Sequence, residues 1–171
     1  MTILWLLLLS VQGADQAVVT LSNGERHEGA FSLTEGRPLE LFYVEKSKRL
    51  RIDPAEIARV SVTVEEEKLE QAWMFREESD HEKIKLTWKY PLRKLTTAVT
   101  LVSGETLTGR ATAVFYVDES RFFLLADQKG GKNQTLEDLV YVKEIVLAGR
   151  KVGGKTLGTI GFDAGKMKNE A

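Results

Sequence analysis

One pattern occurs twice in the chain and constrains its fold more than any other feature. The first copy runs from Val19 to Gly29 and the second from Val99 to Gly109. Each copy has a strand of alternating apolar residues, an Asn-Gly or Ser-Gly turn, and a returning strand that contains a second glycine. Such a pair predicts a hairpin with a two-residue loop, in which both central residues have positive φ. The repeat therefore predicts a small antiparallel sheet that is present twice.

Four glycines of the repeat are expected to shape its turns and bends. Gly24 and Gly104 lie in the two turns, and Gly29 and Gly109 lie in the returning strands. A glycine inside a strand weakens it and usually marks a bulge or a sharp bend. Such bends allow a small sheet to curl into a barrel.

Turn-forming residues divide the rest of the chain into two units of five short strands, residues 16–64 and 97–148. A single helical turn is expected at Pro54–Glu56, before the last strand of the first unit. Five short strands with one tight turn of this kind are typical of a small barrel.

The spacing of the two units indicates a duplication. The opening motifs are offset by 80 residues, and Leu139 and Val142 each lie 82 residues after Ile57 and Val60. A convergent pattern of five strands could look the same, so both origins remain open at this point.

In this layout the chain resembles small β-barrel domains of the SH3-like and Sm-like kind, in which a strand ending in Asn-Gly or Asp-Gly leads to a glycine-bent second strand. The resemblance implies an all-β fold of two tandem five-stranded barrels, without pointing to a specific family. Sm proteins that bind RNA carry a further Ile-Arg-Gly type of motif near the fourth strand. The corresponding places here hold Arg49–Ile52 and Gln134–Leu136, which do not match it.

Between the units, residues 65–96 form a charged and aromatic connector that is expected to be a β-hairpin. With its tip at Asp80 and His81, residues whose numbers sum to 161 would pair, which places Trp73 opposite Trp88. We expect Trp73, Trp88 and Tyr90 to form either a ligand platform, for example for sugar stacking, or a buried core between the two barrels.

Residues 1–13 match a secretory signal peptide. The apolar run Ile3–Leu9 is too short to span a bilayer, which takes about 20 apolar residues, but suits the apolar region of a leader cleaved before Ala14. No Lys or Arg precedes the run, so the true start could lie upstream. The alternative, a buried first strand, is disfavoured because the leucines do not alternate. We therefore expect a secreted or periplasmic protein without a membrane span.

Several chemistries are not expected. The chain has no cysteine, which excludes disulfides and thiolate sites. His27 and His81 lack a spaced third ligand, so no metal site is expected. Gly149–Thr156 fits a phosphate-binding loop pattern, but few helix formers follow it, and residues 149–171 are expected to be a glycine-rich basic tail. No catalytic residue and no cofactor are predicted.

These observations favour an exported, non-enzymatic binding or structural module that contacts a protein or an envelope polymer through its sheet edges or the connector. The oligomeric state stays open. The alternative is an intracellular Sm-like protein that binds RNA or another nucleic acid through basic loop residues, although a net charge of −1 gives no general attraction to phosphates. The basic residues in question are Arg37, Lys46, Lys48, Arg49, Lys129 and Lys132.

The signal peptide predicts that the protein recovered outside the cytoplasm of its native host begins at or near Ala14. The measurement is mass spectrometry of the N-terminal peptide from separated cytoplasmic, envelope and medium fractions. An intact Met1 in the cytoplasmic fraction would contradict export and favour the nucleic-acid alternative.

Overall fold

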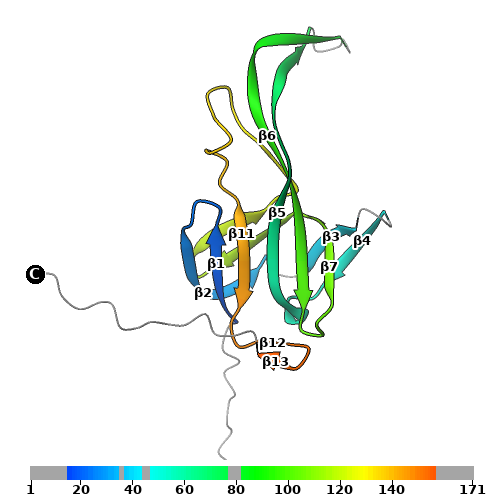
Figure 1. Cartoon of the computed structure of the whole chain (residues 1–171), viewed down its shortest axis with the longest axis vertical. Coiled ribbons are helices and arrows are strands. Elements are labelled where there is room, and N and C mark those ends of the chain that lie inside the picture. Colours follow the sequence, from blue (N-terminus) through cyan, green and yellow to red (C-terminus); the bar gives the residue numbers. More distant parts are fainter. Residues whose placement is uncertain (1–14, 35–36, 44–46, 77–81, 157–171) are drawn as a thin grey trace, which may run out of the picture.

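The computed structural model describes residues 15–34, 37–43, 47–76 and 82–156 (Figure 1). The predicted signal peptide, the hairpin tip at Asp80 and His81, and the end of the predicted tail lie outside the described residues. The strands are β1 Gln16–Leu21, β2 Arg26–Leu33, β3 Leu39–Tyr43, β4 Lys48–Ile52, β5 Ile57–Phe75, β6 Lys83–Leu101, β7 Thr106–Ala111, β8 Ala113–Val117, β9 Ser120–Leu124, β10 Asp127–Lys129, β11 Val142–Leu147, β12 Lys151–Val152 and β13 Lys155–Thr156.

The prediction of an all-β fold is confirmed. Eleven strands form one antiparallel sheet in the order β4-β3-β7-β6-β5-β11-β1-β2-β8-β9, with β10 paired to β6 beside this path. A turn of 3₁₀ helix at Pro54–Glu56 stands where the sequence predicts a helical turn, and the side chain of Asp53 accepts a hydrogen bond from the N–H of Ala55 at 2.8 Å. A separate two-stranded sheet joins β12 and β13.

The strands of residues 16–64 and 97–148 do not form two separate sheets. β1 pairs with β11, β2 with β8, and β3 with β7, so each of these ladders joins one unit to the other. Counted inward from β4, the strands are the fourth and third of the first unit, the second and first of the second unit, and the fifth of the first unit. Counted inward from β9, the order is the same with the two units exchanged. In each half of the sheet the second and first strands come from the other unit, and the two halves meet where β5 pairs with β11.

The registers of the two halves correspond residue by residue. Val19 pairs with Ile145, and Val99 pairs with Val60. The fifth strands are therefore equivalent at an offset of 85 residues, from 60 to 145, and the predicted offset of 82 is wrong by three residues. The cause is the longer connection before β11, which moves Leu139 out of the strand and into a loop.

The hairpin turns differ from the predicted two-residue loops. Gly24 has a φ of 91° and Gly104 a φ of 97°, whereas neither Asn23 nor Ser103 has positive φ. The N–H of Gly24 donates to the carbonyl of Leu21 at 3.0 Å, which closes a type I turn over residues 21–24. Gly24, the last residue of this turn, has the left-handed backbone conformation. The sequence locates both turns correctly, but the prediction of positive φ at both central residues is wrong.

Gly109 allows close approach of the neighbouring strand β3, and Gly29 allows close approach of the turn between β8 and β9. A Cβ on Gly109 would overlap the carbonyl group of Phe42, and a Cβ on Gly29 would overlap the carboxylate of Asp118. That carboxylate accepts a hydrogen bond from the N–H of Ala30 at 2.8 Å. Gly109 is therefore required beside the β3–β7 ladder, where the obstacle is backbone, whereas at Gly29 the obstacle is a side chain.

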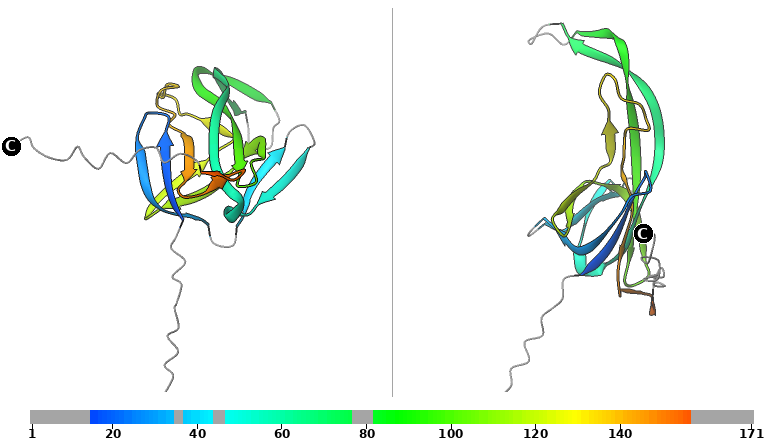
Figure 2. Two further views of the ribbon diagram at one scale, coloured as in Figure 1. Left: turned by 60° about the horizontal axis from the view of Figure 1, so that its bottom comes forward. Right: turned by 90° about the vertical axis from the view of Figure 1, so that its left-hand side faces the viewer.

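The core lies on the inner face of the curved sheet (Figure 2). Phe115 is fully buried, and its ring stacks on Phe122 at 5.4 Å and packs at a tilt against Phe31 at 5.7 Å. Both units and both halves contribute to this core. Its other fully buried side chains include Val19, Leu39, Leu41, Ile57, Leu95, Val99, Ile145 and Leu147.

The segment that fits a phosphate-binding loop forms a hairpin instead of a helix N-terminus. Lys151 pairs with Thr156 across β12 and β13, and Gly153 and Gly154 occupy the turn with positive φ. Just before it, Arg150 donates to the carbonyl of Ile57 at 2.6 Å and to the carboxylate of Asp15. This part of the predicted tail is thus tied to the sheet.

Replacing Gly109 by Ala should destabilise the protein by about 2 kcal/mol, because the added methyl group meets backbone and not a movable side chain. Urea unfolding measures the change. Gly131→Ala is the matched control, since Gly131 is exposed, has no positive φ and offers its Cβ ordinary contact distances, so about 0.5 kcal/mol or less is expected. Equal stability of the two variants would contradict the close approach of β3 and β7.

Candidate functional site

β5 and β6 continue beyond the sheet as a two-stranded ribbon (Figures 1 and 2). Each strand has 19 residues, which span about 60 Å at ~3.3 Å per residue. We call residues 65–76 and 82–94 the arm, and residues 69–76 and 82–89 its distal part. The arm corresponds to the hairpin expected between the two units.

The register of the arm differs from the predicted one. Gln71 pairs with Lys89 and Trp73 with Lys85, so the paired numbers sum to 160 and 158 instead of 161. When this sum changes by one, each side chain of one strand lies opposite a different residue of the other strand, and the side chains that share a face change accordingly. Trp73 therefore lies opposite Lys85, and the predicted pairing of Trp73 with Trp88 is wrong.

An irregularity in the ladder produces this difference. The register shifts between Gln71 and Trp73, and the Gln71 side-chain amide donates to the carbonyls of Leu86 and Trp88, the latter at 2.9 Å. Leu86 and Trp88 have no paired residue on β5 at this bulge, and the Gln71 amide supplies the donor for their carbonyls instead of a backbone N–H. Sequence alternation alone does not reveal a bulge of this kind.

The three predicted site residues do not form one platform. Trp73 packs edge-on against Phe75 at 5.2 Å, with Lys83 Nζ 4.1 Å from its ring centre. Trp88 instead packs against Tyr90 at 6.2 Å. Trp73 is exposed, Trp88 is half-buried and Tyr90 is 5% exposed.

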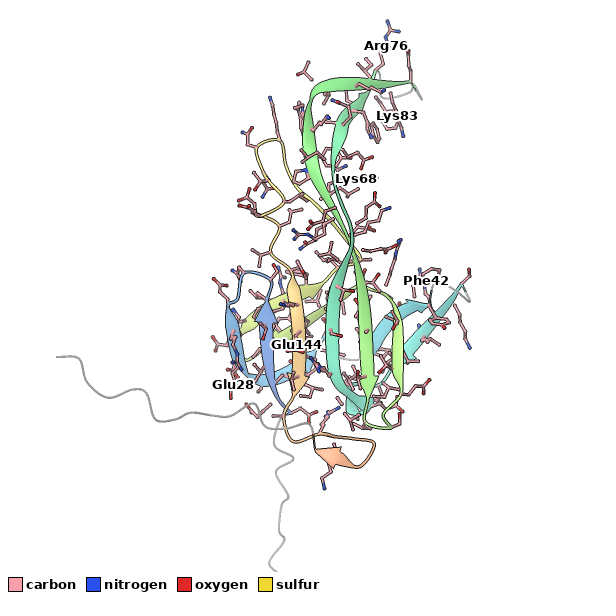
Figure 3. The ribbon with its side chains drawn as sticks, viewed as in Figure 1. Glu28, Phe42, Lys68, Arg76, Lys83 and Glu144 are labelled. Carbon is pink, nitrogen blue, oxygen red and sulfur yellow. The ribbon has the colours of Figure 1, made fainter. Side chains whose placement is uncertain are left out.

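The distal part of the arm gathers exposed apolar side chains. Among the described residues, ten large apolar side chains are exposed, and five of them lie here, between 39% and 57% exposed. Lys83 and Arg76 lie beside them at the end of the arm (Figure 3). The five are Leu69, Trp73, Met74, Phe75 and Ile84.

The base of the arm is covered by β10 and the loop that follows it. β10 pairs with residues 92–94 of β6, and the N–H of Gly130 donates to the carbonyl of Pro91 at 2.9 Å. Lys129 Nζ lies 4.3 Å from the ring centre of Tyr90. β10 and its loop, which cover the base of the arm, extend as far as Tyr90. The exposed apolar side chains lie beyond that point, in the distal part of the arm.

Arg93 holds this loop against the base of the arm. It is 7% exposed and donates from Nε to Glu67 at 2.6 Å. Its other nitrogens donate to the carbonyl of Leu136 at 2.8 Å and to that of Leu139, and its guanidinium lies 5.0 Å from the ring centre of Tyr141. Sequence reasoning missed Arg93, although it extends the alternating series of buried positions at Leu95, Thr97 and Val99.

Two further polar contacts fix the surroundings of Arg93. A hydrogen bond from Lys94, at 2.6 Å, lowers the pKa of Glu66, and a second contact from Lys68 acts in the same direction. In the loop, hydrogen bonds from the backbone and side chain of Thr135 lower the pKa of Asp138. Both carboxylates thus stay ionised at neutral pH.

The basic residues of the nucleic-acid alternative lie in two separate places. Lys48 and Arg49 belong to the edge strand β4, and Arg37 precedes β3. Lys129 and Lys132 belong to the segment at the base of the arm. Lys46 lies outside the described residues.

His27 is near a carboxylate but not in a metal site. Its ring packs edge-on against Phe122 at 4.9 Å, and its Nε2 lies 3.9 Å from Glu25. Within the described ranges, no group of three or more His, Asp and Glu side chains could hold a metal ion. His81 falls outside those ranges.

The described part of the chain contains no helix with the length and hydropathy of a transmembrane span. In comparisons with known proteins, no family model, no curated protein and no solved structure matches the chain.

Replacing Arg93 by Met should destabilise the protein by about 3 kcal/mol, because it leaves the carbonyls of Leu136 and Leu139 and the Glu67 carboxylate without their donor. Hydrogen exchange should also accelerate in residues 130–141. Arg76→Met is the control, since the Arg76–Glu82 pair is exposed and should contribute about 0.5 kcal/mol. Unchanged exchange in the loop would contradict the anchoring role of Arg93.

Proposed function

We propose that this protein is an exported, non-enzymatic binding module that engages a protein partner through the distal part of its arm. The observation that carries the proposal is the concentration of exposed apolar side chains there. Each face of the ribbon carries an exposed apolar pair, Trp73 with Phe75 on one and Met74 with Ile84 on the other, and apolar surface gathered in one region of a folded protein marks an interaction site. Export is supported by the apolar N-terminal run.

The distribution of these side chains over both faces of the ribbon favours a protein over a lipid surface. Met74 pairs with Ile84, so these two share a face, while Trp73 and Phe75 alternate onto the other face with Lys83 and Lys85. A membrane surface is met by one apolar face only. A cleft in a protein can instead contact both faces of an inserted ribbon.

The charges of the distal arm indicate the chemistry of the partner. The described distal residues include four basic and two acidic side chains. Lys83 already lies on the ring of Trp73, so a partner carboxylate can reach the lysine while the ring is buried. We therefore expect an apolar cleft with an acidic rim. The basic side chains are those of Arg76, Lys83, Lys85 and Lys89, and the acidic ones those of Glu70 and Glu82.

We also propose that the two units arose by duplication of a small five-stranded barrel of the SH3-like or Sm-like kind. The support comes from the matched registers, with Val19 on Ile145 and Val99 on Val60, and from the symmetrical strand order. On this view the exchange of strands between the units followed the duplication, and the arm grew from the connection between them.

Two double variants test the arm, one for each face: Trp73→Ser with Phe75→Ser, and Met74→Ser with Ile84→Ser. A photoreactive residue at position 69 identifies the partner in the native host, and calorimetry with the purified partner then measures the affinity. Each double variant should weaken binding by about 30-fold, because buried apolar anchors dominate such interfaces.

The matched control is Phe123→Ser with Val140→Ser, which removes equally exposed apolar side chains outside the arm and should leave the affinity unchanged. Thermal unfolding checks that every variant is folded. Unchanged affinity in both arm variants would contradict the proposal. Binding of the wild type to anionic lipid vesicles, lost in only one of the two arm variants, would show a membrane surface in place of a protein.

A further inference from the structure

Four shallow pockets adjoin on the outer face of the sheet and make one groove that follows the chain from Arg37 along β3 to Tyr43, with β4 on one side and β7 on the other. Their volumes are ≈ 450, 310, 450 and 410 Å³. The first and third share Arg37 and Arg51, the first and second share Glu40 and Thr112, and Arg110 joins the second to the fourth. We call this surface the arginine groove. It lies on the sheet, away from the distal arm, with Phe42 on its wall (Figure 3).

The sheet register places an aromatic ring between two arginines. Phe42 pairs with Arg49 on β4 and with Arg110 on β7, so the three side chains form one row across the strands. The Phe42 ring is exposed, whereas Leu39 and Leu41 of the same strand are buried on the inner face. A second row joins Arg51 to Glu40.

The arginines of the groove retain unused donors. Arg49 and Arg51 share the single carboxylate of Glu40 at long distances of 3.9 and 3.4 Å, and both side chains are about three-quarters exposed. Arg110 lies 3.3 Å from Glu65. Arg37 makes no ion pair with any residue that the structure describes. Each guanidinium carries five N–H donors, so carboxylates from outside can be bound as well.

The remaining lining is rich in groups that exchange hydrogen bonds with hydroxyls. Three carboxylates can accept hydrogen bonds from hydroxyl groups, and threonine hydroxyls can donate or accept them. The carboxylates are those of Glu40, Asp53 and Glu65, and the threonines are Thr34, Thr96, Thr106, Thr108 and Thr112.

We propose that the arginine groove binds an acidic polysaccharide, a chain of sugars that bear carboxylates. The guanidinium groups pair with the sugar carboxylates, the threonines and carboxylates take the sugar hydroxyls, and the Phe42 ring packs on the apolar face of a sugar ring. An elongated groove suits a polymer better than a compact ligand. This site is independent of the arm, so either proposal can fail without the other.

The three carboxylates of the groove repel phosphates and sugar carboxylates alike, so the threonine hydroxyls, and not the charge, favour a sugar polymer over a nucleic acid. The position of the groove argues against a peptide. A peptide that extends the sheet would pair with the free edge of β4, whereas the groove lies over β3, one strand inside that edge. Carboxylate-bearing sugars have both the charge and the hydroxyls that this surface can bind.

Calorimetry of the full chain with polygalacturonate tests the proposal, with neutral dextran and a single-stranded oligothymidylate as comparison ligands. The wild type should bind polygalacturonate with an affinity that falls as salt rises, and should not bind dextran. Arg49→Gln and Arg110→Gln should each lower the affinity about tenfold, because each removes a charge-assisted pair. Phe42→Ala should lower it about fivefold without changing the salt dependence.

Arg121→Gln is the matched control, because Arg121 is an exposed arginine on the opposite edge strand, beside the exposed ring of Phe123. Its affinity for polygalacturonate should equal that of the wild type, as should that of the Trp73→Ser, Phe75→Ser arm variant. Thermal unfolding confirms that each variant is folded, and Arg49→Lys replaces Arg49→Gln if the latter is not. Absence of binding at low salt, equal loss in Arg121→Gln, or tighter binding of oligothymidylate would each overturn the proposal.

Discussion

The backbone ladder between β5 and β6 is the interaction on which both parts of the molecule depend. It runs from Ile57 opposite Leu101 to Phe75 opposite Lys83. Within the sheet it joins the last strand of one unit to the first strand of the other, and beyond the sheet it forms the arm. A two-stranded ribbon alone is marginally stable in water. The arm therefore requires the sheet below it and the cover that Arg93 fixes at its base.

The exchange of strands makes the two units interdependent. β2 leads into β3, but β2 pairs with β8 and β3 with β7, so the connection between β2 and β3 passes from one half of the sheet to the other. Gly109 lies beside the β3–β7 ladder, where a Cβ would meet the backbone of Phe42, and Gly29 lies beside the β2–β8 ladder, where a Cβ would meet the side chain of Asp118. Both copies of the opening motif thus lie where the two units pair with each other, and neither closes a barrel of its own.

The sequence predicts the strands and turns well because alternation and turn residues are local signals. It does not predict which strands become neighbours, since alternation specifies the buried face of a strand and says nothing about its partner. The bulge at Gln71 is invisible for the same reason, and it moves Trp73 away from Trp88. The structural role of Arg93 was not predicted because charged residues are seldom fully buried, although its place in the alternation of β6 indicated burial.

The basic residues of β4 admit two physical explanations, and Phe42 separates them. β4 is an edge strand, and charged side chains on an edge prevent it from pairing with other chains. Edge protection accounts for Lys48, Arg49 and Arg51, but it does not require Arg110, which lies on an inner strand. Nor does it explain an exposed aromatic ring between Arg49 and Arg110, since an apolar ring makes an edge region more prone to association. A binding surface accounts for the ring and for the arginines on either side of it.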